Sequence, residues 1–169
     1  METQHLFDEN NKKSPAIKVC NPLQGKTQVL PIEPYLLGLW LGDGRSRDSV
    51  ISCGKDDYKN VIKILESKGN SYSIIDDKNG NKNIRVGCTT GKKYSNEFRI
   101  QLKKQNLILN KHIPQIYYLA SYEQRLELLK GLMDSDGYVN DKKGMCEYCG
   151  TNKRLVEDVN ILCRTLGFK

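Results

Sequence analysis

Long hydrophobic runs are missing from this sequence of 169 residues. No stretch reaches the roughly 20 apolar residues that a membrane-spanning helix needs. Residues 1–11 are polar and acidic, without the apolar core of a secretion signal. We therefore expect an intracellular protein, nuclear or cytoplasmic, that makes no contact with a membrane.

Cysteine and histidine are scarce, and neither forms a recognisable site. Six cysteines are scattered without an even framework, and an intracellular chain would keep them reduced. Cys146 and Cys149 have the spacing of zinc ligands, but no second pair follows, so we interpret them as small core residues. His112 is interpreted as a loop residue rather than a general base. The chain also lacks a Gly-rich phosphate loop and a Ser-His-Asp pattern.

The composition indicates a folded protein with an uneven charge. Hydrophobic residues make up 38% and charged residues 28% of the chain, which is typical of globular proteins. The net charge is +7, and residues 1–33 are neutral. One segment, 78–111, carries a single acid, Glu97, and nine basic residues: Lys78, Lys82, Arg85, Lys92, Lys93, Arg99, Lys103, Lys104 and Lys111. This block suggests either a phosphate-facing surface or an ordinary solvated lysine-rich face.

A short motif occurs twice. Residues 36–44 read LLGLWLGDG and residues 129–137 read LKGLMDSDG. Each is an apolar run closed by Asp-Gly, and the two aspartates, Asp43 and Asp136, lie 93 positions apart (136 − 43 = 93). We therefore expect two halves of one plan, 34–120 and 121–169, after an N-terminal tail over 1–33.

Hydrophobic periodicity and turn residues predict a similar order of elements in both halves. Ser121 and Gln124 have the spacing of a capping box at the start of the second motif helix. We expect helices over 35–43, 56–68, 95–105, 122–136 and 152–166. Strands are expected over 49–53, 72–75, 83–88, 138–140 and 145–148, with one more, 27–30, in the tail.

Small residues four positions apart mark one face of each motif helix: Gly38 and Gly42 in the first, Gly131 and Ser135 in the second. Such residues let two helix backbones approach closely. We therefore expect the two helices to pack as a seam between the halves, with Trp40 as seam or core packing. Their C-terminal ends would bring Asp43 and Asp136 together.

Two adjacent carboxylates at helix C-termini are electrostatically unfavourable. Each faces the negative end of a helix dipole, and each raises the pKa of the other. A divalent cation relieves both problems, and Mg²⁺ or Mn²⁺ suits such oxygen ligands and can activate water for phosphodiester hydrolysis. The alternative is two buried helices that merely end in Asp-Gly.

These residues resemble the LAGLIDADG (dodecapeptide, DOD-type) homing endonucleases, in the two-motif single-chain form found in inteins. Tyr138-Val139 after the second motif also fits. The run 111–114, Lys-His-Ile-Pro, looks like the family's K-x-I-P block, and 149–167 looks like its helical block after the second motif. The resemblance implies an α+β fold of two pseudo-symmetric αββαββα halves with a saddle of strands on double-stranded DNA, the second half being truncated.

The resemblance also implies roles for individual residues. Asp43 and Asp136 would be the metal-binding catalytic carboxylates. Lys111 would be a catalytic lysine that orients water, or else a phosphate contact. Gly44 and Gly137 would be structural. Strands near 71–88 would enter the major groove, with Lys82 and Arg85 reading guanine edges or binding phosphates, and the basic block would add Lys92 and Lys93.

The chain departs from the intein pattern at its ends. The first residue is neither Cys nor Ser, no His-Asn pair closes the chain, and the second half has no room for a second catalytic lysine. We interpret it as a truncated intein-type or free-standing endonuclease, a monomer with an internal pseudo-twofold, in which residues 1–33 are a tail or a remnant of a splicing domain. The alternatives are an inactive nucleic-acid-binding relic, an RNA-splicing maturase of the same fold, or a fragment of a splicing intein.

Overall fold

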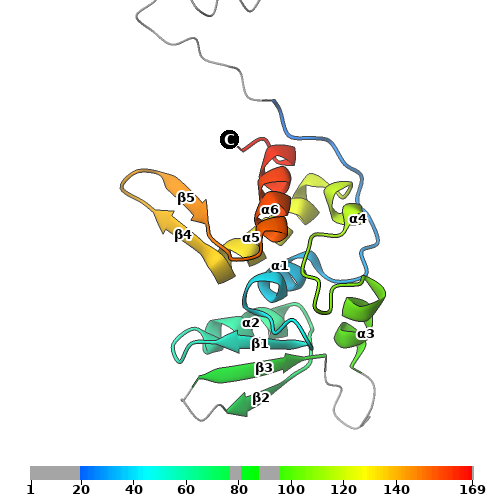
Figure 1. The fold of residues 1–169 in the computed structure, drawn as a ribbon, viewed down its shortest axis with the longest axis vertical. Helices are drawn as coiled ribbons and strands as arrows, with labels where there is room; N and C mark the ends of the chain where they lie inside the picture. Colours follow the sequence, from blue (N-terminus) through cyan, green and yellow to red (C-terminus); the bar gives the residue numbers. More distant parts are fainter. Residues whose placement is uncertain (1–19, 77–80, 88–95, 169) are drawn as a thin grey trace, which may run out of the picture.

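The computed structural model describes residues 20–76, 81–87 and 96–168 (Figure 1). The fold is α+β, as expected. Six helices lie in these ranges: α1 (Pro34–Asp43), α2 (Tyr58–Ser67), α3 (Glu97–Lys104), α4 (Gln115–Tyr118), α5 (Tyr122–Asp136) and α6 (Lys153–Thr165). The strands there are β1 (Val50–Cys53), β2 (Tyr72–Asp76), β3 (Lys82–Val86), β4 (Gly137–Asn140) and β5 (Met145–Tyr148). None of the described helices is both long and apolar enough to cross a bilayer.

The first half has a three-stranded antiparallel sheet of order β1-β3-β2. Ile84 and Val86 on β3 are fully buried and join Leu65 of α2 in the core. The αββαββα pattern predicts one more strand directly after α1, and this strand is reduced to a single bridge between Gly44 and Ile51. The chain turns back too soon for a strand, because Arg45 N donates to Val50 O over 2.7 Å.

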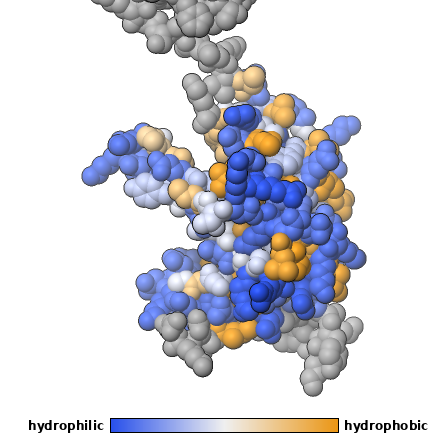
Figure 2. Space-filling model, in the orientation of Figure 1, coloured by the Kyte–Doolittle hydropathy of each residue, from blue (hydrophilic) through white to orange (hydrophobic). Residues whose placement is uncertain are grey.

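The described part of the second half has only the two-stranded hairpin β4–β5. Figure 1 shows this hairpin projecting from the body beside α5 and α6, while the three-stranded sheet lies at the other end, beyond α1. Tyr138 and Val139 are 58% and 56% exposed. Figure 2 shows apolar side chains on the projecting hairpin. The hairpin therefore contributes little to the core.

Helices α1 and α5 pack against each other along the predicted seam (Figure 1). Every residue of α1 from Tyr35 to Leu41 is buried. A Cβ at Gly38 would overlap Leu128 O, and a Cβ at Gly131 would overlap Tyr35 O. The close approach of two helix backbones is therefore reciprocal, and both glycines are required by the space between the helices.

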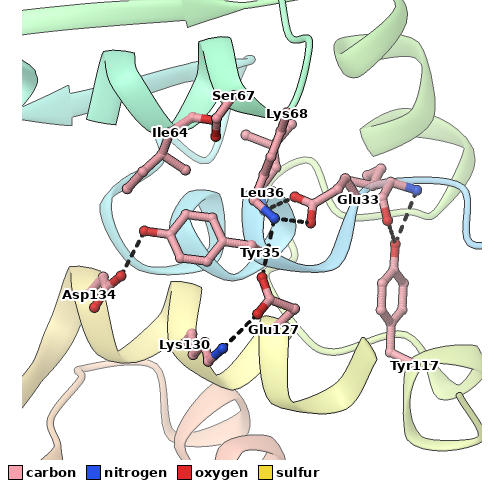
Figure 3. Close-up of polar contacts among 11 residues, drawn as sticks. Glu33, Tyr35, Leu36, Ile64, Ser67, Lys68, Tyr117, Glu127, Lys130 and Asp134 are labelled. Atoms are coloured by element: carbon pink, nitrogen blue, oxygen red, sulfur yellow. Dashed lines mark hydrogen bonds and ion pairs between the residues drawn. The ribbon is translucent and has the colours of Figure 1, made fainter. Parts of the chain in front are cut away.

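Polar contacts join the halves at the start of α1 (Figure 3). The Lys68 ammonium lies 2.8 Å from Glu33 Oε1 and 3.2 Å from Glu127 Oε2. Tyr35 OH donates to Asp134 Oδ2 over 2.7 Å. Glu33 also caps α1, accepting from Leu36 N over 2.8 Å. The contacts of Glu33, Lys68 and Glu127 fix the seam at the start of α1, and Tyr35 adds a bond to the last turn of α5.

Residues 20–33 form an extended strap over the second half. The strand expected over 27–30 is absent, because the strap bonds to side chains rather than to another strand. Gln28 exchanges two hydrogen bonds with the Gln124 side chain, of 2.9 and 2.7 Å. Gln124 also completes the predicted capping box with Ser121. The Tyr117 hydroxyl bonds both backbone groups of Ile32.

Candidate active site

The paired helices place the two motif aspartates side by side. Asp43 is the last residue of α1 and Asp136 the last of α5. A Cβ at Gly42 would lie 3.2 Å from Asp136 Oδ2 and would overlap Ser135 Oγ, so Asp136 lies against the final turn of α1. The small residues of the motif thus let the two carboxylates approach.

The glycines after the aspartates also have a steric role. Gly44 and Gly137 both adopt extended backbone conformations that any residue allows, with φ of −72° and −88°. A Cβ at Gly44 would overlap Trp40 O, and one at Gly137 would overlap Met133 O. The backbone after each helix therefore runs close against the last turn of that helix. This close contact keeps the aspartate at the helix end.

The electrostatics of the pair agree with the repulsion expected from the sequence. Burial, followed by the charges of Asp136 and Asp57, raises the pKa of Asp43 from 3.8 to about 6, although Lys111 acts in the opposite direction. The fold therefore destabilises the ionised form of Asp43, which a nearby cation would stabilise.

Lys111 comes from the loop between α3 and α4 and reaches the same place. Its ammonium donates to Gly42 O over 2.9 Å. Burial lowers the pKa of Lys111 to about 8, while Asp136 and Asp43 act to raise it. Asn152 Nδ2 donates to Lys111 O over 2.9 Å, so the second half holds the backbone of this loop. The structure thus brings Asp43, Asp136 and Lys111 together.

Two further side chains at this centre were not predicted as functional. Trp40 presents its ring to Lys111 Nζ, 5.3 Å from the ring centroid. Tyr148 OH lies 3.5 Å from Asp136 Oδ2, and burial and Asp136 raise its pKa. The pairing of Gly137 with Tyr148 in the hairpin brings this tyrosine to the site. Only the strand register could have identified it, and the length of the turn sets that register.

The donor set fits a hard divalent cation. Aspartate oxygens are the ligands that Mg²⁺ and Mn²⁺ accept, and such ions keep several positions for water and phosphate oxygen. Within the described residues no cluster of three or more His, Cys, Asp and Glu side chains could enclose a metal. Asp43 and Asp136 therefore suit an open, oxygen-rich site shared with a phosphate.

The predicted DNA contacts separate in the structure. Arg85 is exposed on the face of β3 opposite Ile84 and Val86. Lys82 alternates with it onto the other face, with its Nζ 5.8 Å from the Tyr58 ring centroid of α2. Lys92 and Lys93 lie outside the described residues.

The sheet face that carries Arg85 mixes polar and apolar side chains, since Val50 lies opposite Arg85 and Ile75 lies opposite Asn83. In the strand register, Asn83 lies opposite Ser52 of β1, and Arg85 lies opposite Ser73 of β2. The Ser52 hydroxyl donates to Asn83 Oδ1 over 3.0 Å. Hydroxyl, amide and guanidinium groups on one sheet face are the groups that bond to base edges and phosphates.

The interpretation of Cys146 and Cys149 as core residues was wrong. Both are exposed, because Cys146 lies on the projecting hairpin and Cys149 directly follows it. His112 Nδ1 lies 2.7 Å from Asn110 O, in the loop where it was expected. Neither feature adds to the centre formed by the two aspartates.

Comparison with known proteins identifies a family over the C-terminal part of the chain. Residues 123–169 match the family model of the LAGLIDADG-like domain. Over 82% of its length, this chain is 33% identical to replicative DNA helicase DnaB of Mycobacterium intracellulare. Over 76% of its length, it is 31% identical to probable translation initiation factor IF-2 of Methanocaldococcus jannaschii. The chain spans only 19% and 11% of these two relatives' own lengths.

Solved structures show the same fold. Mesophilic variants of the homing endonuclease I-DmoI share 17% identity with a TM-score of 0.52, over 81% of this chain and 72% of theirs. I-DmoI in complex with DNA and Mn shares the same identity and TM-score, over 81% of this chain and 78% of that one. The resemblance to LAGLIDADG proteins read from the two motifs is therefore confirmed: residues 123–169 match the LAGLIDADG-like domain, and the chain has the α+β fold of the homing endonuclease I-DmoI.

Proposed function

We propose that this chain is a site-specific DNA endonuclease that hydrolyses both strands of its target with Mg²⁺ or Mn²⁺. The observation that carries the proposal is the meeting of Asp43, Asp136 and Lys111 at the ends of the two seam helices. I-DmoI, which has the same fold, has been solved with DNA and Mn. A bound cation would lower the pKa of a water molecule and stabilise charge on the phosphate.

The chain's own residues supply the remaining functions. Asp43 and Asp136 would hold the cation, and positive charge beside Asp43 would favour its ionised form. Lys111, whose pKa of about 8 is close to neutral pH, donates hydrogen bonds to water or to a phosphate oxygen and can exchange a proton there. Its bond to Gly42 O keeps the ammonium at the end of α1.

The sheet face that carries Arg85 is proposed as the DNA-reading surface of the first half. Arg85, Asn83, Ser52 and Ser73 would meet base edges or phosphates from the exposed face. Lys82, at the end of β3, is proposed as a phosphate contact, as are Lys92 and Lys93. Phosphate contacts make DNA affinity depend steeply on salt, whereas base contacts determine the sequence that is cut.

The relatives support an intein-type origin. A protein named as a helicase and another named as an initiation factor match the same chain, over only 19% and 11% of their lengths. Proteins with such different names would share this segment if it were an inserted element, separate from either named activity. We propose that it acts as a monomer in which the seam is the pseudo-twofold between the halves.

The test is cleavage of a plasmid library in Mg²⁺ by the wild type and by an Asp43→Asn, Asp136→Asn double variant. Asp141→Asn is the matched control, because this aspartate is exposed in the hairpin turn. We expect defined cuts with the wild type and the control. The double variant should lose at least about 1,000-fold in rate, since a metal supplies several kcal/mol to the transition state. Equal cutting by all three proteins would contradict the proposal.

A second candidate is a nucleic-acid-binding relic or RNA-splicing maturase of the same fold. It is favoured by the small strand surface of the second half, where the described residues include only β4 and β5. Salt-dependent binding of DNA or RNA without cutting in Mg²⁺ or Mn²⁺ would identify it. Binding is measured on the same library by retention in Ca²⁺ at two salt concentrations.

A further inference from the structure

Trp40 is more than a filler of the seam. Its side chain is fully buried, at 0% exposed. The indole Nε1 donates to Asp48 O over 2.9 Å. Phe98 meets the indole edge-to-face, with 6.5 Å between the ring centroids and an interplanar angle of 88°. A hydrogen bond and an aromatic contact therefore fix the plane of the ring.

A charged side chain lies over the fixed ring. Lys111 Nζ lies 5.3 Å from the ring centroid, within the range of a cation–π contact. The same ammonium donates to Gly42 O over 2.9 Å. A lysine side chain is long and flexible, and a single hydrogen bond leaves its head free to swing about that bond. The ring supplies a second support at an angle to the first.

We propose that Trp40 is a positioning residue that holds the Lys111 ammonium beside the Asp43–Asp136 pair. This inference rests on the proposed endonuclease function. With Gly42 O taking one of its three N–H donors, Lys111 keeps donors for a water molecule or a phosphate oxygen. A residue with similar apolar bulk but no aromatic face would fill the seam without fixing the ammonium.

A double-mutant cycle separates positioning from mere packing. The variants are Trp40→Leu, Lys111→Met and the two combined, with single-turnover cleavage of a target selected by the wild type. We expect Trp40→Leu to slow cleavage about tenfold when Lys111 is present, because the variant removes the cation–π contact that holds the ammonium. In the Lys111→Met background it should cause no further loss. Equal losses in both backgrounds would show that Trp40 only packs.

Two measurements accompany the cycle. Trp40→Phe keeps a ring face and should retain more activity than Trp40→Leu, although both remove the bond to Asp48 O. DNA affinity measured in Ca²⁺ should be unchanged in Trp40→Leu and Trp40→Phe, so the loss appears in the rate of the chemical step. A loss that followed DNA affinity or thermal stability instead would overturn the proposal.

A readout without catalysis comes from fluorescence, since Trp40 is the only tryptophan of the chain. Lys111→Met should shift the emission maximum or intensity of Trp40. Lys130→Met is the matched control, because Lys130 pairs with Glu127 on the exposed side of α5. An unchanged spectrum in Lys111→Met would overturn the contact itself. If Lys111→Met shifts the spectrum but the wild type never cleaves DNA, the contact exists and the endonuclease function is refuted, together with the catalytic use of this contact.

Discussion

The two halves begin with the same motif and then differ. At the seam they are nearly equivalent, since Gly38 meets the backbone of α5 and Gly131 meets the backbone of α1. Away from the seam, the sheet of the first half has a completely buried face, with Ile84 and Val86 of β3 at 0% exposed. In the second half, the described hairpin leaves Tyr138 and Val139 more than half exposed.

The difference teaches where the motif acts. A backbone-to-backbone contact fixes residue identity on both sides, because no side chain can move aside to accept a Cβ. A sheet face fixes identity only where another layer covers it. The second half instead gains the strap over 20–33, which bonds to α4, α5 and the end of α6. The halves are thus equivalent at the centre and individually stabilised outside it.

The largest expected effect breaks the equivalence at the seam. Gly38→Ala and Gly131→Ala each place a methyl group on a carbonyl oxygen of the facing helix. We expect each variant to lose about 3–5 kcal/mol of unfolding free energy, because the backbone itself must move. Denaturant melts measure this loss. Gly150→Ala is the control, since its Cβ would lie 3.5 Å from Val156 Cγ2, an ordinary contact. Equal losses in all three variants would contradict the seam's role.

The next largest loss of stability is expected where Arg125 holds the strap. Arg125 is 1% exposed, and its guanidinium bonds Thr165 O over 2.9 Å and also Leu23 O, so it ties the strap to α5 and α6. Arg125→Met keeps the length but removes the donor to Leu23 O and one of the two donors to Thr165 O, which keeps only the bond from Leu23 N. We expect a loss of about 2–4 kcal/mol, and faster proteolysis within 20–33. The control is Arg154→Met, an exposed arginine on α6 whose bond is to the Asn110 side chain. A strap as protected as in the wild type would show that Arg125 does not hold it.

The sequence predicted the helices well because each carries its own signals. Pro34 begins α1, the Ser121–Gln124 capping box begins α5, and Gly69 and Gly167 follow α2 and α6 with positive φ. Five of the six expected strands also form, each within two residues of its predicted ends, and only the one expected over 27–30 is absent, while the short helix α4 was not predicted. No strand forms over 27–30, because the strap bonds to the side chains of Tyr117, Gln124 and Arg125 and to the backbone of Thr165 rather than to another strand.

The residues of the candidate site could be predicted from the sequence only in part. Asp43 and Asp136 follow from the repeated motif, while Lys111 came from the family resemblance, and the structure brings all three together. Trp40 reads as core in any hydrophobic pattern, and its contact with Lys111 depends on the path of a loop about 70 residues away (111 − 40 = 71). The opposite faces of Lys82 and Arg85 follow from the register and burial of β3, which net charge does not reveal.

Replacing Asp43 by asparagine should raise the free energy of unfolding, although Asp43 is a residue of the proposed site. Asp43 has a pKa of about 6 in the fold against 3.8 ordinarily, so its ionised form is penalised above pH 6. Asp43→Asn should therefore unfold at higher denaturant than the wild type at pH 7 without metal. The two pKa values differ by about two units, but partial exposure and the lost attraction to Lys111 reduce the gain to about 1–2 kcal/mol.

The sign with pH follows from the same two pKa values. As pH falls from 6 toward 4, wild-type Asp43 takes up its proton and the penalty disappears, so the advantage of Asp43→Asn should vanish. Added Mg²⁺ should stabilise the wild type more than the variant, because it binds the folded form. Asp141→Asn, the exposed control, should show neither effect. An Asp43→Asn protein less stable than the wild type at pH 7 would rule out repulsion at this pair.

The smallest expected effect sharpens the contrast between the sheets. Val139→Thr replaces a methyl group by a hydroxyl on a side chain that is 56% exposed, so water can bond to the new group. We expect a change within about 0.5 kcal/mol. Ile84→Thr makes a similar exchange at 0% exposed in β3, where the hydroxyl is buried and a cavity opens, and should cost at least about 2 kcal/mol. If both variants lost the same stability, Val139 would have to be covered by other residues in solution. The asymmetry between the halves would then hold only for the described residues.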